Sequence, residues 1–177
     1  MGSHARTPPS AWALALLLGL AQLHNVLLFS SGTLAANVAA AVGVTTGHPQ
    51  WRTDQARILG PYLMRAVSAL LHVEPRASYL LVFTVALGVA GILTWQLGRR
   101  TGDTRTAWLA MLTLHVLFFV ARTRPWLFVW DSCGLVLFLL FVRFIVDDRP
   151  WPWFAALAVP AILNRESGLY IPVWLAL

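Results

Sequence analysis

The sequence predicts an all-α protein, a polytopic transmembrane helical bundle with about six hydrophobic segments and an interfacial amphipathic helix. The composition supports this fold class, because 58% of the 177 residues are hydrophobic and only 11% are charged. Soluble domains carry roughly 25% charged residues, so this chain has too little charge to cover a water-facing surface. Several apolar runs also approach the roughly 20 residues that an α-helix needs to cross a bilayer core.

The apolar runs follow one another along a single transmembrane domain, residues 1–177. The first run is interpreted as a retained membrane helix, because no cleavage site followed by a soluble domain comes after it. The last run is too short to cross a bilayer, so we expect residues 1–177 to be the N-terminal part of a longer protein. Alternatively, residues 151–177 form one tilted span with charges inside it. The six runs cover residues 11–29, 79–97, 107–120, 132–146, 151–163 and 169–177.

The longest interruption of the apolar runs, residues 30–76, is expected to be an extracytoplasmic loop. A turn rich in Gly, Thr and Pro is predicted at residues 43–49. Over residues 58–71, apolar side chains recur with a spacing of three and four, which is typical of an amphipathic helix. We expect this helix to lie on the membrane surface, and Pro61 to kink it or to begin it again.

The basic residues are all arginine, and the net charge is +6. They form no basic run, so headgroup anchoring or an anionic substrate explains them better than nucleic acid. The cluster of Arg99, Arg100 and Arg105 favours a cytoplasmic location for the loop that holds it. The alternation of spans then places three charged segments together on the outer face, at residues 51–57, 122–131 and 164–166.

Two carboxylates in these outer segments are candidate catalytic groups. Asp54 precedes the amphipathic helix, where the helix dipole favours a carboxylate, and it could accept a proton from an acceptor hydroxyl. The alternative is an N-cap residue paired with Arg57. Asp131 opens the fourth run after Trp130. It is either an N-cap residue or a second carboxylate that faces the same outer cavity as Asp54. Such a pair could share the role of base or bind a divalent metal, with Asp131 as a metal ligand.

The outer segments also contain candidate substrate-binding residues. Arg165 and Glu166 interrupt an apolar stretch, either as a solvated tight loop or as a phosphate site. In the second case the planar guanidinium of Arg165 would grip phosphate oxygens, oriented by Glu166. Arg57, Arg122 and Arg124 are further phosphate-binding candidates, and interfacial anchoring is the alternative for the last two.

The order of these features resembles the N-terminal membrane module of GT-C-type glycosyltransferases, the polyprenyl-phosphate-sugar-dependent enzymes. Protein O-mannosyltransferases and the aminoarabinose transferases of lipid A are examples. The shared features are a first outer loop with an acidic residue and an amphipathic helix, a short inner loop, an Asp that opens the fourth span, and a charged motif inside a late apolar run. The chain departs from the pattern because Asp54 stands alone where the family often has two adjacent acidic residues, and because the later spans and the soluble domain of many members are absent.

The resemblance implies an inverting sugar transfer at the outer face of a multi-pass membrane protein in the plasma (inner) membrane of a bacterium. The expected partners are the lipid bilayer and a lipid-linked sugar donor. Asp54 would be the base, Asp131 would hold a metal or the acceptor, and Arg165 would grip the donor phosphate. Two other classes also fit these charges: a transporter or lipid flippase fragment, and a non-catalytic membrane subunit.

Overall fold

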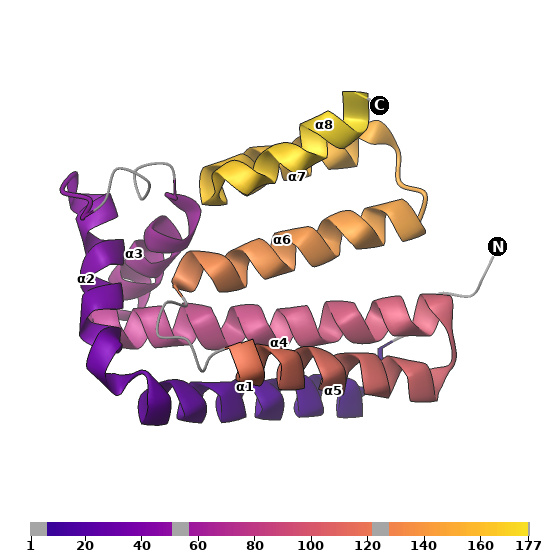
Figure 1. The fold of residues 1–177 in the computed structure, drawn as a ribbon, viewed down its shortest axis with the longest axis horizontal. Coiled ribbons are helices and arrows are strands. Elements are labelled where there is room, and N and C mark those ends of the chain that lie inside the picture. The colour runs from indigo at the N-terminus through magenta and orange to yellow at the C-terminus, as the bar shows by residue number, and fades with distance from the viewer. Residues whose placement is uncertain (1–6, 51–56, 122–127, 177) are drawn as a thin grey trace.

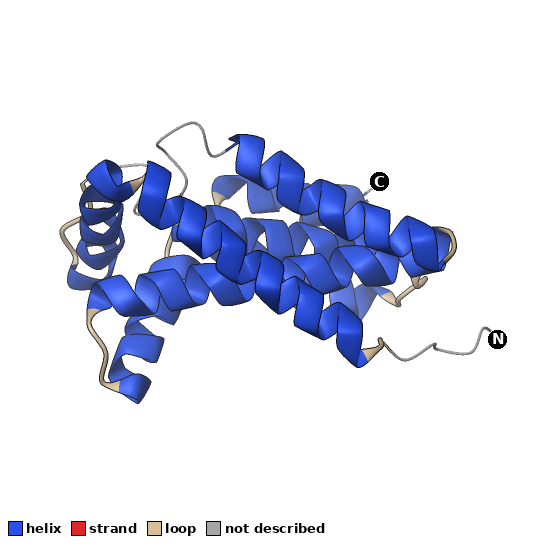
Figure 2. Cartoon of the chain, turned by 90° about the horizontal axis from the view of Figure 1, so that it is seen from below, coloured by secondary structure: helices blue, strands red, loops and turns tan. Residues whose placement is uncertain are grey.

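The computed structural model describes residues 7–50, 57–121 and 128–176, and this part of the chain is all-helical. Helices hold 87% of it and strands none, and short loops join the helices (Figure 2). The elements are α1 (Pro9–Phe29), α2 (Ser31–Thr46), α3 (Leu59–Leu71), α4 (Pro75–Thr101), α5 (Thr104–Ala121), α6 (Val129–Val146), α7 (Trp151–Asn164), η2 (Glu166–Leu169) and α8 (Tyr170–Ala176). Helices α1, α4, α5, α6 and α7 run lengthwise, α2 and α3 lie across one end, and α8 lies along α7 (Figure 1).

Three of these helices, α1, α4 and α6, are long and apolar enough to cross a membrane. Shorter apolar helices are α3, α7 and the part of α5 that covers Thr104–Val120. Large apolar side chains on the outer faces of α1 and α5 are exposed, among them Leu17 and Leu117, as expected for helices that contact lipid rather than water. These findings indicate a membrane protein, whereas the predicted number of six spans is not established.

Helix α4 forms the centre of the bundle. In its most apolar window 61% of the residues are buried, against 22% for α1 and 39% for α6. Glycines allow the neighbouring helices to approach closely. A Cβ atom at Gly98 would lie 2.7 Å from the Cα atom of Ala107 on α5, and one at Gly19 on α1 would lie 3.1 Å from the carbonyl oxygen of Thr84. Because both contacts are to backbone, a larger side chain would push the helices apart.

The tight connection between α4 and α5 is stabilised by Asp103. Its Oδ1 accepts hydrogen bonds from the backbone N–H of Thr106, at 2.7 Å, and from the Thr106 hydroxyl, at 2.9 Å. These bonds favour the charged carboxylate and lower the pKa of Asp103. Asp103 therefore acts as the N-cap that begins α5.

The region expected to be a loop, residues 30–76, contains two helices instead of one. Helix α2 extends to Thr46, so the prediction of a turn from residue 43 was wrong, and the chain turns at Gly47, where φ is +77°. Five alanines between residues 35 and 41 explain the helix, because Ala has the highest helix propensity. The amphipathic helix is confirmed as α3, and Pro61 lies in its first turn, where a missing N–H is tolerated.

The end of the chain folds back along α7. The ring of Trp174 in α8 lies 4.8 Å from that of Phe154 in the first turn of α7 and 5.4 Å from that of Phe141 on α6. The alternative of one tilted span over residues 151–177 was therefore wrong. The reversal occurs because Arg165 is extended and the N–H of Gly168 then donates to the Arg165 carbonyl oxygen at 2.8 Å.

Candidate functional site

Three helix ends converge at the end of the bundle that carries α2 and α3 (Figure 1). The backbone N–H of Ile58, before α3, donates to the carbonyl oxygen of Leu163 near the end of α7, at 2.8 Å. The next residue, Asn164, donates from Nδ2 to the carbonyl oxygen of Trp130 in the first turn of α6, also at 2.8 Å. Asn164 is almost fully buried, and a buried amide needs a hydrogen-bond partner. The bond to Trp130 therefore holds the end of α7 against the start of α6.

The Asp131 carboxylate joins the same helix ends. Its Oδ2 accepts from the backbone N–H of Phe128 at 2.9 Å, and its Oδ1 lies 3.0 Å from Nη1 of Arg165. Phe128 is the N-cap of α6, so the alternative that Asp131 itself is the N-cap was wrong. Asp131 lies three positions later and satisfies an N–H group that helix geometry leaves without a partner. The Asp131 side chain is 19% exposed and that of Arg165 is 47% exposed, so the arginine lies nearer the surface of the protein than the aspartate does.

Arg57 is the second cation of the cluster. Its guanidinium carbon lies 5.6 Å from the ring centroid of Trp130, within the range of a cation–π contact. Arg57 and Arg165 both attract the Asp131 carboxylate electrostatically. Trp130 is fully buried and stacks on Phe128 with 4.4 Å between ring centroids. Among the described residues of the cluster, two arginines and one aspartate give a net positive charge, which suits an anionic ligand.

A cavity of about 590 Å³ lies beside this cluster, between α5, α6, α7 and the start of α8. Sites for small ligands span roughly 300–1,000 Å³. Its walls are mostly apolar, and its polar lining residues all belong to the convergence of α6 with α7 and α8. The lining residues are Leu114, Leu117, Phe118, Trp130, Asp131, Gly134, Leu135, Leu137, Phe138, Ala161, Asn164, Arg165, Gly168 and Tyr170.

Three of these lining residues carry a buried polar atom for which the described residues provide no partner. The atoms are Nε1 of Trp130, Oδ1 of Asn164 and the hydroxyl oxygen of Tyr170. Buried polar groups without a hydrogen bond are costly.

The structure brings three of the predicted site residues together, namely Arg57, Asp131 and Arg165. Asp131 and Arg165 line the cavity, whereas Arg57 does not. Asp54, Arg122 and Arg124 lie outside the described residues. Glu166 belongs to η2 by its backbone, but its side chain also lies outside the described part.

A metal at Asp131 finds no further ligands in the described ranges. No group of three or more His, Cys, Asp or Glu side chains occurs within residues 7–50, 57–121 and 128–176. Both Asp131 oxygens have protein partners, so a divalent ion would need ligands from elsewhere, and metal binding remains a prediction.

The sequence analysis did not identify the residues whose role in the site depends on tertiary contacts. Asn164, the aromatic Tyr170 and the close contact at Gly168 were not singled out as candidates. The signal for Asn164 was available, since it is an uncharged polar residue at the end of an apolar helix. Its partner, a backbone carbonyl 34 residues away, leaves no trace in composition or spacing.

Comparisons of the chain with protein-family models, with curated proteins and with solved structures find no match. The site itself combines the Asp131–Arg165 pair with Arg57 nearby, a largely apolar cavity, and buried polar atoms on residues that line this cavity.

Proposed function

We propose that this chain is a membrane-embedded, GT-C-like glycosyltransferase that binds the phosphate of a polyprenyl-phosphate sugar donor at Arg165. The observation that supports this most is the Asp131–Arg165 pair bordering a largely apolar cavity of about 590 Å³. A half-exposed guanidinium beside apolar walls matches a ligand with an anionic head and a hydrocarbon chain.

The walls of the cavity suit the hydrocarbon part of such a donor. Leu114, Leu117 and Phe118 come from α5, and Leu135 and Phe138 come from α6. Leu117 and Phe138 are exposed at the surface of the bundle, so the cavity is accessible from the side that lipid would cover. A polyprenyl chain could reach the cavity from the bilayer, with its phosphate held at the level of the helix ends.

The proposed reaction is an inverting transfer. The oxygen of an acceptor hydroxyl attacks the anomeric carbon of the sugar, the bond from that carbon to the phosphate oxygen breaks, and polyprenyl phosphate leaves with the electron pair. A carboxylate takes the hydroxyl proton, and Asp54 is the proposed base. Arg165, with Arg57 nearby, would stabilise the charge that develops on the departing phosphate. Asp131, which already has two partners, would position Arg165.

Binding of polyprenyl phosphate to the full chain in nanodiscs of neutral lipid tests the first step. We expect Arg165→Gln to weaken binding by about tenfold or more, the equivalent of losing one charge-assisted hydrogen bond. Arg76→Gln is the matched control, since Arg76 is an exposed arginine at the start of α4 that does not line the cavity. Uncharged polyprenol should bind both variants equally. Equal affinities of the two variants for polyprenyl phosphate would contradict a phosphate site at Arg165.

Release of polyprenyl phosphate from a labelled donor, with membranes that supply acceptors, tests the chemistry. We expect Asp54→Asn to abolish release while donor binding remains. Normal release in that variant would remove Asp54 as the base. Donor binding together with movement of intact donor between leaflets, and no release by the unmodified chain, would instead favour a lipid flippase.

A further inference from the structure

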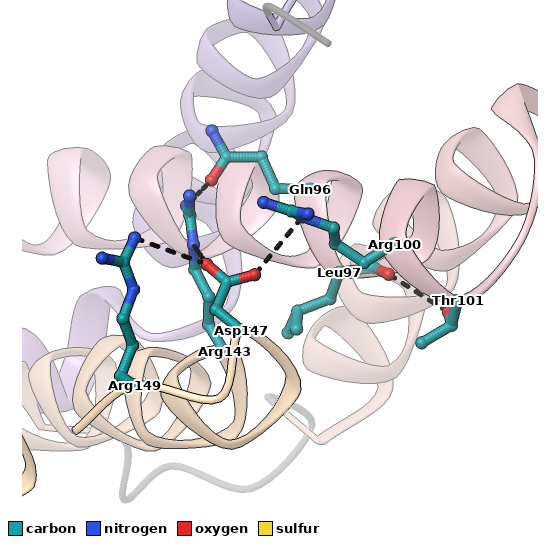
Figure 3. A network of polar contacts seen from close by, with 7 residues as sticks. All are labelled: Gln96, Leu97, Arg100, Thr101, Arg143, Asp147 and Arg149. Carbon is teal, nitrogen blue, oxygen red and sulfur yellow. Dashed lines mark hydrogen bonds and ion pairs between the residues drawn. The ribbon is translucent and has the colours of Figure 1, made fainter. Parts of the chain in front are cut away.

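A second charged cluster lies at the opposite end of the bundle, where α6 ends. Asp147 is surrounded by arginines from three places: Arg100 in the last turn of α4, Arg143 on α6, and Arg149 in the turn before α7 (Figure 3). The nitrogen–oxygen distances to Asp147 are 3.3 Å from Arg100, 3.4 Å from Arg143 and 3.8 Å from Arg149. Arg143 also donates to Oε1 of Gln96 on α4.

Within the described part of the chain the cluster has a net positive charge, even when the neighbouring Asp148 is counted with Asp147 against the three arginines. Three guanidinium groups face one aspartate, whose side chain is only 4% exposed. The arginines are exposed by 30% to 41%, so their charge reaches the surface while the negative charge is inside. Guanidinium groups fixed in this way present further N–H donors whose planar geometry suits a phosphate.

Side chains around the cluster place it where a membrane meets water. Trp151 and Trp153 follow it at the start of α7 and are both exposed, as tryptophans of interfacial belts are. Arg149 lies over the ring of Trp153, 5.7 Å from its centroid. Ile145 and Val146, which directly precede Asp147, expose their apolar side chains.

We propose that the arginines around Asp147 bind the phosphate headgroup of an anionic phospholipid, whose acyl chains pack against Ile145 and Val146. The combination favours a lipid over a soluble phosphate, because exposed apolar and aromatic side chains border the cations on the same helix ends. This site is separate from the Asp131–Arg165 cavity and does not depend on the donor proposed there.

The consequence is an orientation for the protein. Arg99, Arg105 and the Asp147 cluster lie at the same end, since Arg99 and Arg105 flank the short connection from α4 to α5. The cytoplasmic leaflet is the anionic one in many membranes, and it attracts basic residues close to helix ends. The Asp147 cluster therefore faces the cytoplasm, and the cavity at the other end faces outward.

The test measures lipid affinity of the purified full chain by native mass spectrometry, with phosphatidylglycerol and phosphatidylcholine titrated in mixed micelles. We expect the unmodified chain to bind phosphatidylglycerol about tenfold more tightly than phosphatidylcholine. The double variant Arg100→Gln, Arg149→Gln should lose about fivefold or more of that affinity. The control Arg99→Gln, Arg105→Gln removes the same charge at the same end and should change it less than about twofold.

Several results would overturn the proposal. One is an equal loss of affinity in the two double variants, and another is equal affinity of the unmodified chain for the two lipids. A third is displacement of phosphatidylglycerol by glycerol 3-phosphate at matching concentration, which would indicate a site for free phosphate.

Circular dichroism checks the folding of each variant. If the double variant does not fold, Arg149→Gln decides alone, because Arg149 has the longest contact with Asp147. Arg149→Lys, which keeps the charge, should then recover most of the affinity.

Discussion

Arg165 reaches across 34 residues of sequence to the carboxylate of Asp131, with 3.0 Å between Nη1 and Oδ1. The aspartate opens α6 and the arginine directly follows α7, so the pair joins two helix ends. Because Asp131 also satisfies the N–H of Phe128, it is a fixed point to which the more exposed arginine is attached. An external anion could engage the remaining N–H groups of Arg165 without breaking this attachment.

The contribution of this pair to stability can be measured by a double-mutant cycle. We expect a coupling of about 0.5–1 kcal/mol between Asp131→Asn and Arg165→Gln, a modest value because solvent screens the half-exposed Arg165. The free energies of unfolding of both single variants and the double variant in detergent provide it. Strictly additive effects would show that the contact contributes nothing to stability.

Replacing Asn164 by Leu should destabilise the protein. The substitution removes the hydrogen bond to the Trp130 carbonyl oxygen from a buried position, and we expect a loss of about 1–3 kcal/mol. Leu163→Ala, on the more exposed side of the same helix, is the control and should cost less. Denaturant titration monitored by tryptophan fluorescence would report both. A smaller loss for Asn164→Leu than for the control would argue against the bond.

The turn between α7 and α8 should not tolerate a side chain at Gly168. A Cβ atom there would lie 2.2 Å from the carbonyl carbon and oxygen of Ala161, so we expect Gly168→Ala to cost about 1–3 kcal/mol. The N–H of Gly168 is bonded to the Arg165 carbonyl oxygen, so donor binding should weaken as well. Gly32→Ala is the control, because no atom lies within 4 Å of its Cβ position in α2, and it should be neutral or stabilising. Thermal unfolding and donor binding of both variants test this, and unchanged behaviour of Gly168→Ala would contradict the geometry.

Two buried polar residues in the middle of the bundle should respond differently to substitution by Leu. Gln22 on α1 donates to the carbonyl oxygen of His115 at 2.8 Å, so Gln22→Leu should cost about 1 kcal/mol. Neither ring nitrogen of His115 has a hydrogen-bond partner among the described residues, so His115→Leu should be neutral or stabilising. Unfolding midpoints of the two variants provide the comparison. A large loss for His115→Leu would mean that the imidazole has a partner in the folded protein.

Asp147 should be more important for stability than its neighbour Asp148. Asp147→Asn would leave three arginines close together around a neutral group, and we expect a loss of about 1–3 kcal/mol, discounted because the arginines are partly exposed. Asp148 is exposed and has a φ of +49°, a backbone conformation that Asn adopts readily, so Asp148→Asn is a matched control with little expected effect. Similar melting temperatures for the two variants would indicate that the arginines do not depend on Asp147.

The sequence predicted helices where long apolar runs occur, and their alternation placed Arg57, Asp131 and Arg165 at one end. Local patterns suffice for that, because a run of apolar residues specifies a helix whatever it packs against. Helix α2 was missed because its residues lack both a long apolar run and a clear stripe. The Asp147 cluster was not predicted, since Arg100 and Asp147 are distant in sequence. Only the spacing of four between Arg143 and Asp147 hinted at a pair.

The backbone bond from Ile58 to the Leu163 carbonyl oxygen connects the amphipathic helix α3 to the residue just before Asn164 and Arg165. How deeply α3 sits in the headgroup layer would thereby influence where the arginine stands. Bilayer thickness or curvature that lifts α3 would pull on the end of α7 and strain the contacts of the ligand cavity. Binding of the proposed donor phosphate at Arg165 would then depend on the physical state of the surrounding membrane, with no soluble effector involved.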